Sequence, residues 1–194
     1  MVTALRAAGR QHVAVELDGT PWRTLPLEAV VCAGLADGVE LDRPRARELG
    51  RQLRRLAALR TATAALQRRD QSARELEQRL DHRGVAPVEV ERTLSTLRSA
   101  GLVDDGRFAR ERARTLASRA SGDALIRDDL ERRGIGPDEI EAALAGLEPE
   151  AERASAVVSR RGPGAKTARY LASRGFEEDA VAMSVAAEED ATVG

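Results

Sequence analysis

The sequence repeats one stretch of residues, and this duplication restricts the possible folds more than any other feature. "RLDHRGVAPVEVERTL" at residues 79–94 recurs as "DLERRGIGPDEIEAAL" at residues 129–144. Around these stretches, residues 72–97 align without a gap on residues 122–147, and a more divergent copy, "YLASRGFEEDAVAMSV", occupies residues 170–185. A unit this short hides its apolar face poorly on its own, so we expect neighbouring units to stack.

The repeated stretch has the signals of two helices joined by a tight turn. Ser72 and Glu75 have the S-x-x-E spacing of a capping box, which predicts the start of a helix. Gly84 is expected to end that helix, with Val85 as the apolar residue of a Schellman motif, and Pro87 to begin the next one. The chain direction should reverse at the three equivalent glycines, Gly84, Gly134 and Gly175.

Each copy is also preceded by a helical pattern, so a complete unit contains three helices. The predicted units are residues 43–103, 104–149 and 150–194, the last of which ends in an acidic tail. We therefore predict a mainly α protein, in which tandem three-helix repeats stack into an elongated, curved rod. Residues 1–42 are predicted to form a small N-terminal module that contains a β-hairpin and a short helix.

The hairpin prediction rests on a change of periodicity near the N-terminus. Apolar residues alternate through Val13, Val15 and Leu17, as in a half-buried strand, and Asp18-Gly19 is a dipeptide preferred in tight hairpin turns. Pro21 restricts the returning strand to the edge of a sheet, because proline cannot donate to the ladder. The segment 26–34 then has the pattern of a short helix.

Composition gives no support to several classes of function. The single Cys32 cannot form an internal disulfide, and the only histidines, His12 and His82, are isolated from other metal ligands. We expect no catalytic residues, metal site or cofactor. The sequence has no apolar run of the roughly 20 residues that span a bilayer and no obvious signal peptide. These features predict a cytoplasmic protein with no membrane partner.

Charge is unevenly distributed along the chain, although the formal net charge is only −1. Residues 43–83 contain 12 arginines and 5 acidic residues, a net charge of +7. Such a segment could form a basic face for a polyanion, or it could be a solvated helix surface. Arginine accounts for all but one of the 31 basic residues, the exception being Lys166, so its abundance alone is weak evidence for phosphate binding.

A winged helix is the main alternative fold for the middle of the chain. The segment 72–103 has the rhythm of a helix, a turn and a recognition helix, followed by Gly-Leu-Val as if entering a wing. However, "DDGRFARERARTLASR" at residues 104–119 continues as a helix, for which Asp104 is the expected N-cap. A winged helix also does not predict three copies.

Two other motifs are better explained by local structure than by chemistry. The stretch "RRGPGAKTA" suggests a phosphate-binding loop, but Arg160 and Ala165 occupy the positions where that motif requires glycine. We therefore interpret it as the turn between two helices. The pair Asp104-Asp105 is interpreted as helix capping, because acidic residues are favoured at helix N-termini.

The stretch "AGLVDDGRFARERARTLASRASGDALIRDDLERRGI" at residues 100–135 resembles the signature of the RecX regulatory family. The matching features are Gly-Leu, an Asp before Phe-Ala, a basic helix, a Gly, an Ile-x-x-x-Leu helix and Gly-Ile. They fall on Gly101, Leu102, Asp105, Phe108, Ala109, Arg119, Gly122, Ile126, Leu130, Gly134 and Ile135. The resemblance covers roughly residues 45–190, and residues 12–41 look like the N-terminal extension of some members.

The resemblance implies a regulator rather than an enzyme. Its expected partner is the RecA recombinase filament, in whose helical groove it would lie while mostly inhibiting the ATPase, coprotease and strand-exchange activities. It implies roles in recombination, DNA repair and the SOS response, weak to moderate binding of single- and double-stranded DNA, and a monomer. From the residues alone, a DNA-binding transcription regulator and an α-helical scaffold for another protein remain alternatives.

The candidate binding residues are basic positions that recur in the repeats or lie in the +7 segment. Arg69, Arg119 and Arg160 end the first helix of each unit, and Arg83, Arg133 and Arg174 precede each turn glycine. Stacking should align such equivalents along one edge. The predicted filament- or DNA-binding residues are Arg54, Arg68, Arg69, Arg79, Arg83, Arg119, Arg127, Arg132, Arg133, Arg160, Arg161 and Lys166.

Overall fold

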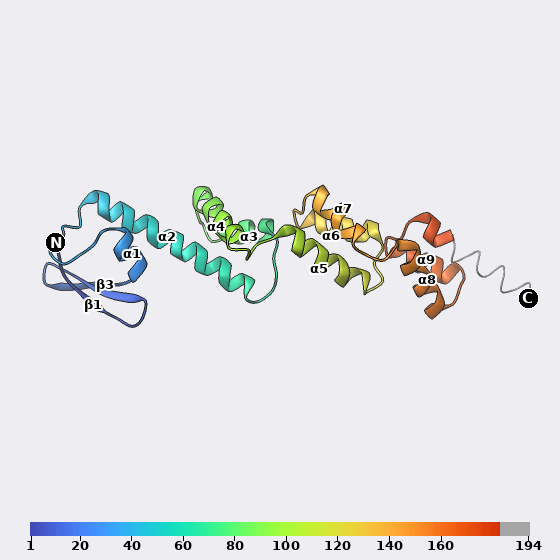
Figure 1. The fold of residues 1–194 in the computed structure, drawn as a ribbon, viewed down its shortest axis with the longest axis horizontal. Coiled ribbons are helices and arrows are strands. Elements are labelled where there is room, and N and C mark those ends of the chain that lie inside the picture. Colours follow the sequence, from blue (N-terminus) through green and yellow to red (C-terminus); the bar gives the residue numbers. More distant parts are fainter. Residues whose placement is uncertain (183–194) are drawn as a thin grey trace, which may run out of the picture. The chain divides into compact units, whose positions relative to one another are not determined.

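The N-terminal strands form a three-stranded antiparallel sheet in the computed structural model, which describes residues 1–182. Strands β1 (Val2–Ala7), β2 (His12–Leu17) and β3 (Thr20–Pro26) lie in the order β1-β2-β3. Figure 1 shows this N-terminal part in blue. The predicted hairpin is β2–β3, and Asp18 and Gly19 have φ of 49° and 77°, as its tight turn requires. The first strand, β1, was not predicted. Pro21 lies on the edge strand, as expected.

Helices α1 (Leu27–Cys32) and α2 (Arg43–Leu66) complete this N-terminal part. Asp42 caps α2 by accepting a hydrogen bond of 2.9 Å from the backbone N–H of Arg45. The sheet and these helices share one apolar cluster, because alternate strand residues face α1 and the start of α2. Its buried members are Val2, Val13, Val15, Leu25, Ala29, Val30, Ala33, Leu35 and Leu49.

The rest of the described chain is helical, which confirms the predicted fold class. The helices are α3 (Ala73–Asp81), α4 (Pro87–Ser99), α5 (Asp105–Ala117), α6 (Asp123–Arg132), α7 (Pro137–Ala145), α8 (Glu150–Arg161) and α9 (Ala165–Ser173). Residues 178–182 are also helical, and the predicted continuation of this helix with its acidic tail lies outside the described residues. Two compact units are formed, residues 1–68 with 77–96 and residues 69–76 with 97–182.

The three turn glycines adopt the predicted conformation. Gly84, Gly134 and Gly175 have φ of 71°, 73° and 77°, the left-handed region that glycine tolerates best. After each one, the next N–H bonds to the leucine carbonyl five residues earlier, which is the Schellman pattern. These bonds are Val85 to Leu80 (3.2 Å), Ile135 to Leu130 (3.1 Å) and Phe176 to Leu171 (3.2 Å).

The structure rules out the winged-helix alternative at residues 101–119. Gly101 has φ of 68° and ends α4 in another Schellman turn, with the N–H of Leu102 bonded to the carbonyl of Leu97 at 2.9 Å. Asp104 then caps α5 by accepting 2.8 Å from the N–H of Arg107. The Gly-Leu-Val sequence therefore forms the turn that ends α4. Helix α5 follows it, where a winged helix would have a strand.

Candidate functional site

Within the second compact unit, the start of α3 contacts the turn after α6. The hydroxyl of Ser72, which is fully buried, donates to the carbonyl of Arg133 at 2.7 Å. The same oxygen accepts from the N–H of Glu75 at 3.2 Å, which completes the predicted capping box. A Cβ added at Gly134 would lie 2.6 Å from the Cβ of Arg74. The glycine at this turn therefore also permits the close approach of the preceding repeat.

The start of α6 contacts the turn after α9 in the same way. The N–H of Gly122 donates to the carbonyl of Arg174 at 2.8 Å, and that of Ala124 donates to the carbonyl of Gly175 at 3.2 Å. A Cβ added at Gly122 would overlap the backbone of Gly175. Because Gly122 is the repeat equivalent of Ser72, the same junction between repeats occurs twice.

Each junction is completed by a carboxylate from the first helix of the following repeat. Asp105, at the start of α5, accepts from the N–H of Ala73 at 2.8 Å. Glu150, at the start of α8, accepts from the N–H of Asp123 at 2.6 Å. Both residues of the Asp104-Asp105 pair thus cap helices, as predicted. Asp104 caps α5, whereas Asp105 caps α3 of the preceding repeat.

The first junction carries a network of arginines and carboxylates. Arg112 binds both oxygens of Asp129 at 2.8 and 2.9 Å, and Arg133 bridges Asp129 (2.8 Å) and Glu75 (2.6 Å). The hydrogen bond from Arg112, together with Arg133, lowers the pKa of Asp129 to about 2, and partial burial opposes this shift. The same hydrogen bond raises the pKa of Arg112. Both groups are therefore charged at neutral pH.

The second junction uses arginines differently. Arg174 donates to the carbonyls of Ala120 (3.0 Å) and Arg119 (2.9 Å) and to the hydroxyl of Ser121 (2.8 Å). Arg153, whose side chain is 9% exposed, pairs with Asp123 and donates to two backbone carbonyls. Both side chains hold the repeats together, and neither projects freely into solvent.

The predicted binding residues differ in the contacts that they make. Four of them form ion pairs: Arg69 with Glu75, Arg127 with Glu141, Arg132 with Asp128, and Arg133 with Glu75 and Asp129. Arg161 lies 4.0 Å from the centre of the Tyr170 ring, and Arg79 is exposed. Six others are exposed and have no ion pair among residues 1–182: Arg54, Arg68, Arg83, Arg119, Arg160 and Lys166. The structure thus gives Arg133 and Arg174 an internal role.

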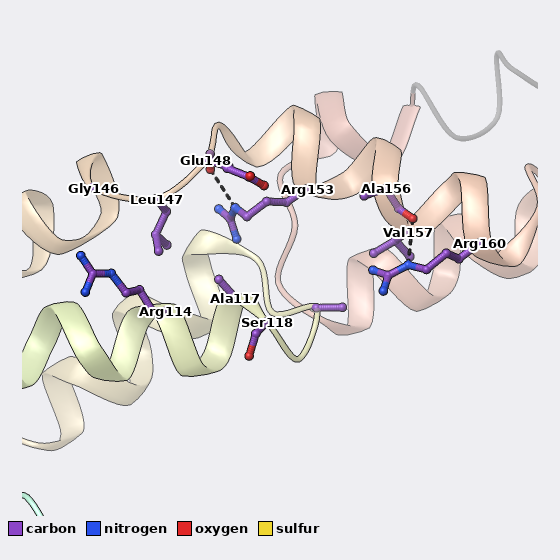
Figure 2. A pocket seen from close by; sticks show the side chains of 11 residues that line it. Arg114, Ala117, Ser118, Gly146, Leu147, Glu148, Arg153, Ala156, Val157 and Arg160 are labelled. Atoms are coloured by element: carbon purple, nitrogen blue, oxygen red, sulfur yellow. Dashed lines mark hydrogen bonds between the residues drawn. The ribbon is translucent and has the colours of Figure 1, made fainter.

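A groove lies between the end of α5, the loop before α8 and α8 itself (Figure 2). Its volume is about 420 Å³, and its lining includes Arg114, Ser118, Leu147, Arg153 and Arg160. Of these, only Arg160 was among the predicted residues. Arg153 could have been found as the repeat equivalent of Arg112 at the offset of 41, whereas Arg114 carries no repeat signal.

A second groove of about 590 Å³ lies between residues 69–75 and α5. Arginines and acidic residues both line it, and they include the Arg69–Glu75 and Arg133–Glu75 pairs. Among residues 1–182, no group of three or more metal-ligating side chains converges and no helix is apolar and long enough to cross a membrane.

Comparison with known proteins identifies the family. Residues 104–144, which cover α5, α6 and most of α7, match the model of the second three-helix domain of RecX. The chain is 38% identical to the regulatory protein RecX of Chromohalobacter salexigens over 134 residues, which is 64% of this chain and 88% of that protein. It is 37% identical to the RecX of Halorhodospira halophila, over 66% of this chain and 87% of that protein.

Two solved structures share the fold. A crystal structure of a regulatory protein RecX matches with a TM-score of 0.79 at 22% identity, over 94% of this chain and 97% of the other. The RecX of Lactobacillus salivarius matches with a TM-score of 0.59 at 19% identity, over 68% and 94%. These two matches show the fold, whereas the two relatives above are 38% and 37% identical to this chain, which covers 88% and 87% of their length. The chain therefore belongs to the RecX family, whose members are regulatory proteins and not enzymes.

Proposed function

We propose that this chain binds in the groove of the filament that the RecA recombinase forms on DNA, and that it mostly inhibits the recombinase, ATPase and coprotease activities. Membership of the RecX family is the observation that carries this proposal. The chain would act as a monomer in the cytoplasm and would influence recombinational DNA repair and the SOS response.

Exposed arginines support a contact with the polyanionic filament. In the first compact unit, Arg54, Arg68 and Arg83 are exposed and have no ion pair among the described residues. Each exposed charge contributes under about 1 kcal/mol to a binding free energy. Several such charges acting together on DNA phosphates release counterions, so their combined contribution depends steeply on salt. We expect weak to moderate binding to single- and double-stranded DNA on its own.

Co-sedimentation with RecA filaments tests the proposal. The chain is mixed with filaments assembled on single-stranded DNA in the presence of a slowly hydrolysed ATP analogue, and with DNA alone and RecA alone as controls. We expect the chain to pellet with the filament at concentrations that leave it in the supernatant with either component. The DNA-dependent ATPase of RecA should fall over the same range. A chain that stays in the supernatant and leaves the ATPase unchanged would refute the proposal.

A further inference from the structure

The two repeat junctions differ in their carboxylates, and the difference at Glu75 bears on charge. At the first, Glu75 pairs with Arg69 at 3.1 Å and with Arg133 at 2.6 Å. The residue that aligns with Glu75 in the next repeat is Leu125, which cannot pair with an arginine. Arg119, the equivalent of Arg69, accordingly has no ion pair among residues 1–182. The second junction therefore has unused positive charge where the first is internally neutralised.

The groove at this second junction is also lined by guanidinium groups with N–H donors that make no hydrogen bond within the described residues. Figure 2 shows Arg114 and Arg160 toward opposite ends of the groove, with Arg153 between them. Among residues 1–182, Arg160 donates only to the carbonyl of Ala156 on its own helix, at 3.0 Å. Arg114 uses one nitrogen for Glu111, at 3.0 Å, on the exposed face of α5. Each guanidinium has five N–H donors, so both side chains can donate hydrogen bonds to a further carboxylate.

The rest of the lining distinguishes a protein partner from nucleic acid. Ala117, Leu147, Ala156 and Val157 supply apolar surface between the arginines. Glu148, which is exposed, also lines the groove. Glu148 would repel a phosphate and a peptide carboxylate alike, so the apolar lining is what separates the two ligands. A phosphate backbone has no aliphatic group to place on that lining. A protein segment that alternates acidic and aliphatic side chains can use both the arginines and the apolar surface.

We propose that the groove between α5 and α8 takes an acidic segment of a protein, whose carboxylates pair with Arg114 and Arg160 while an aliphatic side chain contacts Leu147 and Ala156. This inference rests on the proposed function, because it assigns the groove to the protein component of the filament. Contact with DNA is then left to arginines elsewhere, such as those of residues 43–83.

Three variants test this assignment in the full chain. Arg114→Glu/Arg160→Glu reverses both charges, and Ala156→Gln narrows the groove without changing charge. Arg169→Glu is the control for a single charge reversal, because Arg169 is also exposed. Within the described part of the chain it likewise donates only to a carbonyl one turn earlier, that of Ala165 at 3.2 Å. Circular dichroism confirms that each variant keeps its helical content. Binding is measured by co-sedimentation with filaments on single-stranded DNA and by fluorescence anisotropy with the labelled DNA alone.

We expect the double variant to lose about tenfold or more in affinity for the filament, since two ion pairs are replaced by two repulsions. Ala156→Gln should also weaken filament binding, while Arg169→Glu should not, and affinity for DNA alone should change less than that for the filament. If the double variant binds the filament like the wild type, the groove is not used, although the proposed function stands. If its affinity for DNA alone falls in parallel, the groove binds phosphate and the inference is overturned. A wild-type chain that does not bind the filament refutes the proposed function instead.

Discussion

The hydroxyl of Ser72 donates a hydrogen bond of 2.7 Å to the carbonyl of Arg133, 61 residues further along the chain. One serine thereby caps α3 and satisfies a carbonyl at the end of α6 in the following repeat. The bond also brings Arg74 against Gly134, so the conformation of the turn and the packing of the next repeat constrain the same glycine. Stability at this turn should therefore depend on more than its backbone angles.

Substitution of Gly134 should cost more than substitution of Gly84. Both glycines have nearly the same φ, 73° and 71°, so alanine pays a similar left-handed penalty of about 1 kcal/mol at each. Only at Gly134 would the new Cβ also meet a side chain, that of Arg74 at 2.6 Å. We expect Gly134→Ala to lower the free energy of unfolding by about 1–3 kcal/mol more than Gly84→Ala. Equal losses in urea titrations followed by circular dichroism would show that Arg74 moves aside freely.

Replacing Ala120 by glycine should stabilise the protein. Ala120 has φ of 56° and occupies the left-handed position of a Schellman turn, in which the N–H of Ser121 bonds to the carbonyl of Leu116 at 3.1 Å. Glycine avoids the steric cost at this position, which offsets the lost methyl contact and should raise stability by up to about 1 kcal/mol. Ala57→Gly, at an exposed position well inside α2, is the control and should instead destabilise by about 1 kcal/mol. A lower thermal midpoint for Ala120→Gly would contradict this expectation.

Stability should depend on the ionisation of Asp129 in acid. The arginines lower its pKa in the folded state to about 2, below the ordinary value of 3.8. The stabilisation is therefore fully present above about pH 4 and is lost as the pH falls toward 2. With allowance for solvent screening, it amounts to about 1–2 kcal/mol.

The measurement compares the free energy of unfolding at pH 6 and near pH 2.5 for three proteins. Asp129→Asn should be less stable than the wild type at pH 6, and the two should converge in acid. Asp128→Asn is the matched control, since Asp128 is the adjacent residue and, within residues 1–182, pairs only with Arg132 on the helix surface. A constant difference between Asp129→Asn and the wild type at both pH values would show that charge on Asp129 contributes nothing.

The basic segment should determine how DNA binding responds to salt. Arg54, Arg68 and Arg83 are exposed and lack ion pairs among residues 1–182, so their replacement by glutamine should leave the fold intact. The slope of log affinity against log salt for single-stranded DNA should fall by about one for each arginine that contacts a phosphate. Arg98→Gln, an exposed arginine outside this segment, should leave the slope unchanged. An unaltered slope in the triple variant would mean that these arginines form only a solvated surface.

Features that depend on neighbouring residues could be predicted from the sequence. The turn at Asp18-Gly19, the capping box at Ser72 and the glycine after α3 all follow from short local patterns. Strand β1 was missed because the register shifts between Val2 and Ala4, which interrupts the alternation that marks a strand. A bulge of this kind has no clear signature in a six-residue segment.

The roles of the arginines were harder to predict, because they depend on partners far along the chain. Arg133 and Asp129 are four residues apart on one helix, so their pairing could have been anticipated. The second partner of Arg133 is Glu75, which is 58 residues away and becomes a neighbour only when the repeats pack. Sequence periodicity predicted the turn glycines Gly84, Gly134 and Gly175, but it could not separate arginines that join neighbouring helices from arginines that face solvent.

The carboxylate of Glu150 has a consequence for how the protein is made. It caps α6 through the N–H of Asp123, and it also accepts from the N–H of Glu177 at 3.1 Å. During synthesis the ribosome releases α6 before α8, so the nascent helix emerges with this amide still unpaired. Formation of the final hydrogen bonds of α6 must wait for residues translated later. In a stalled or truncated nascent chain that ends before Glu150, water would therefore have to take the place of this carboxylate at the start of α6.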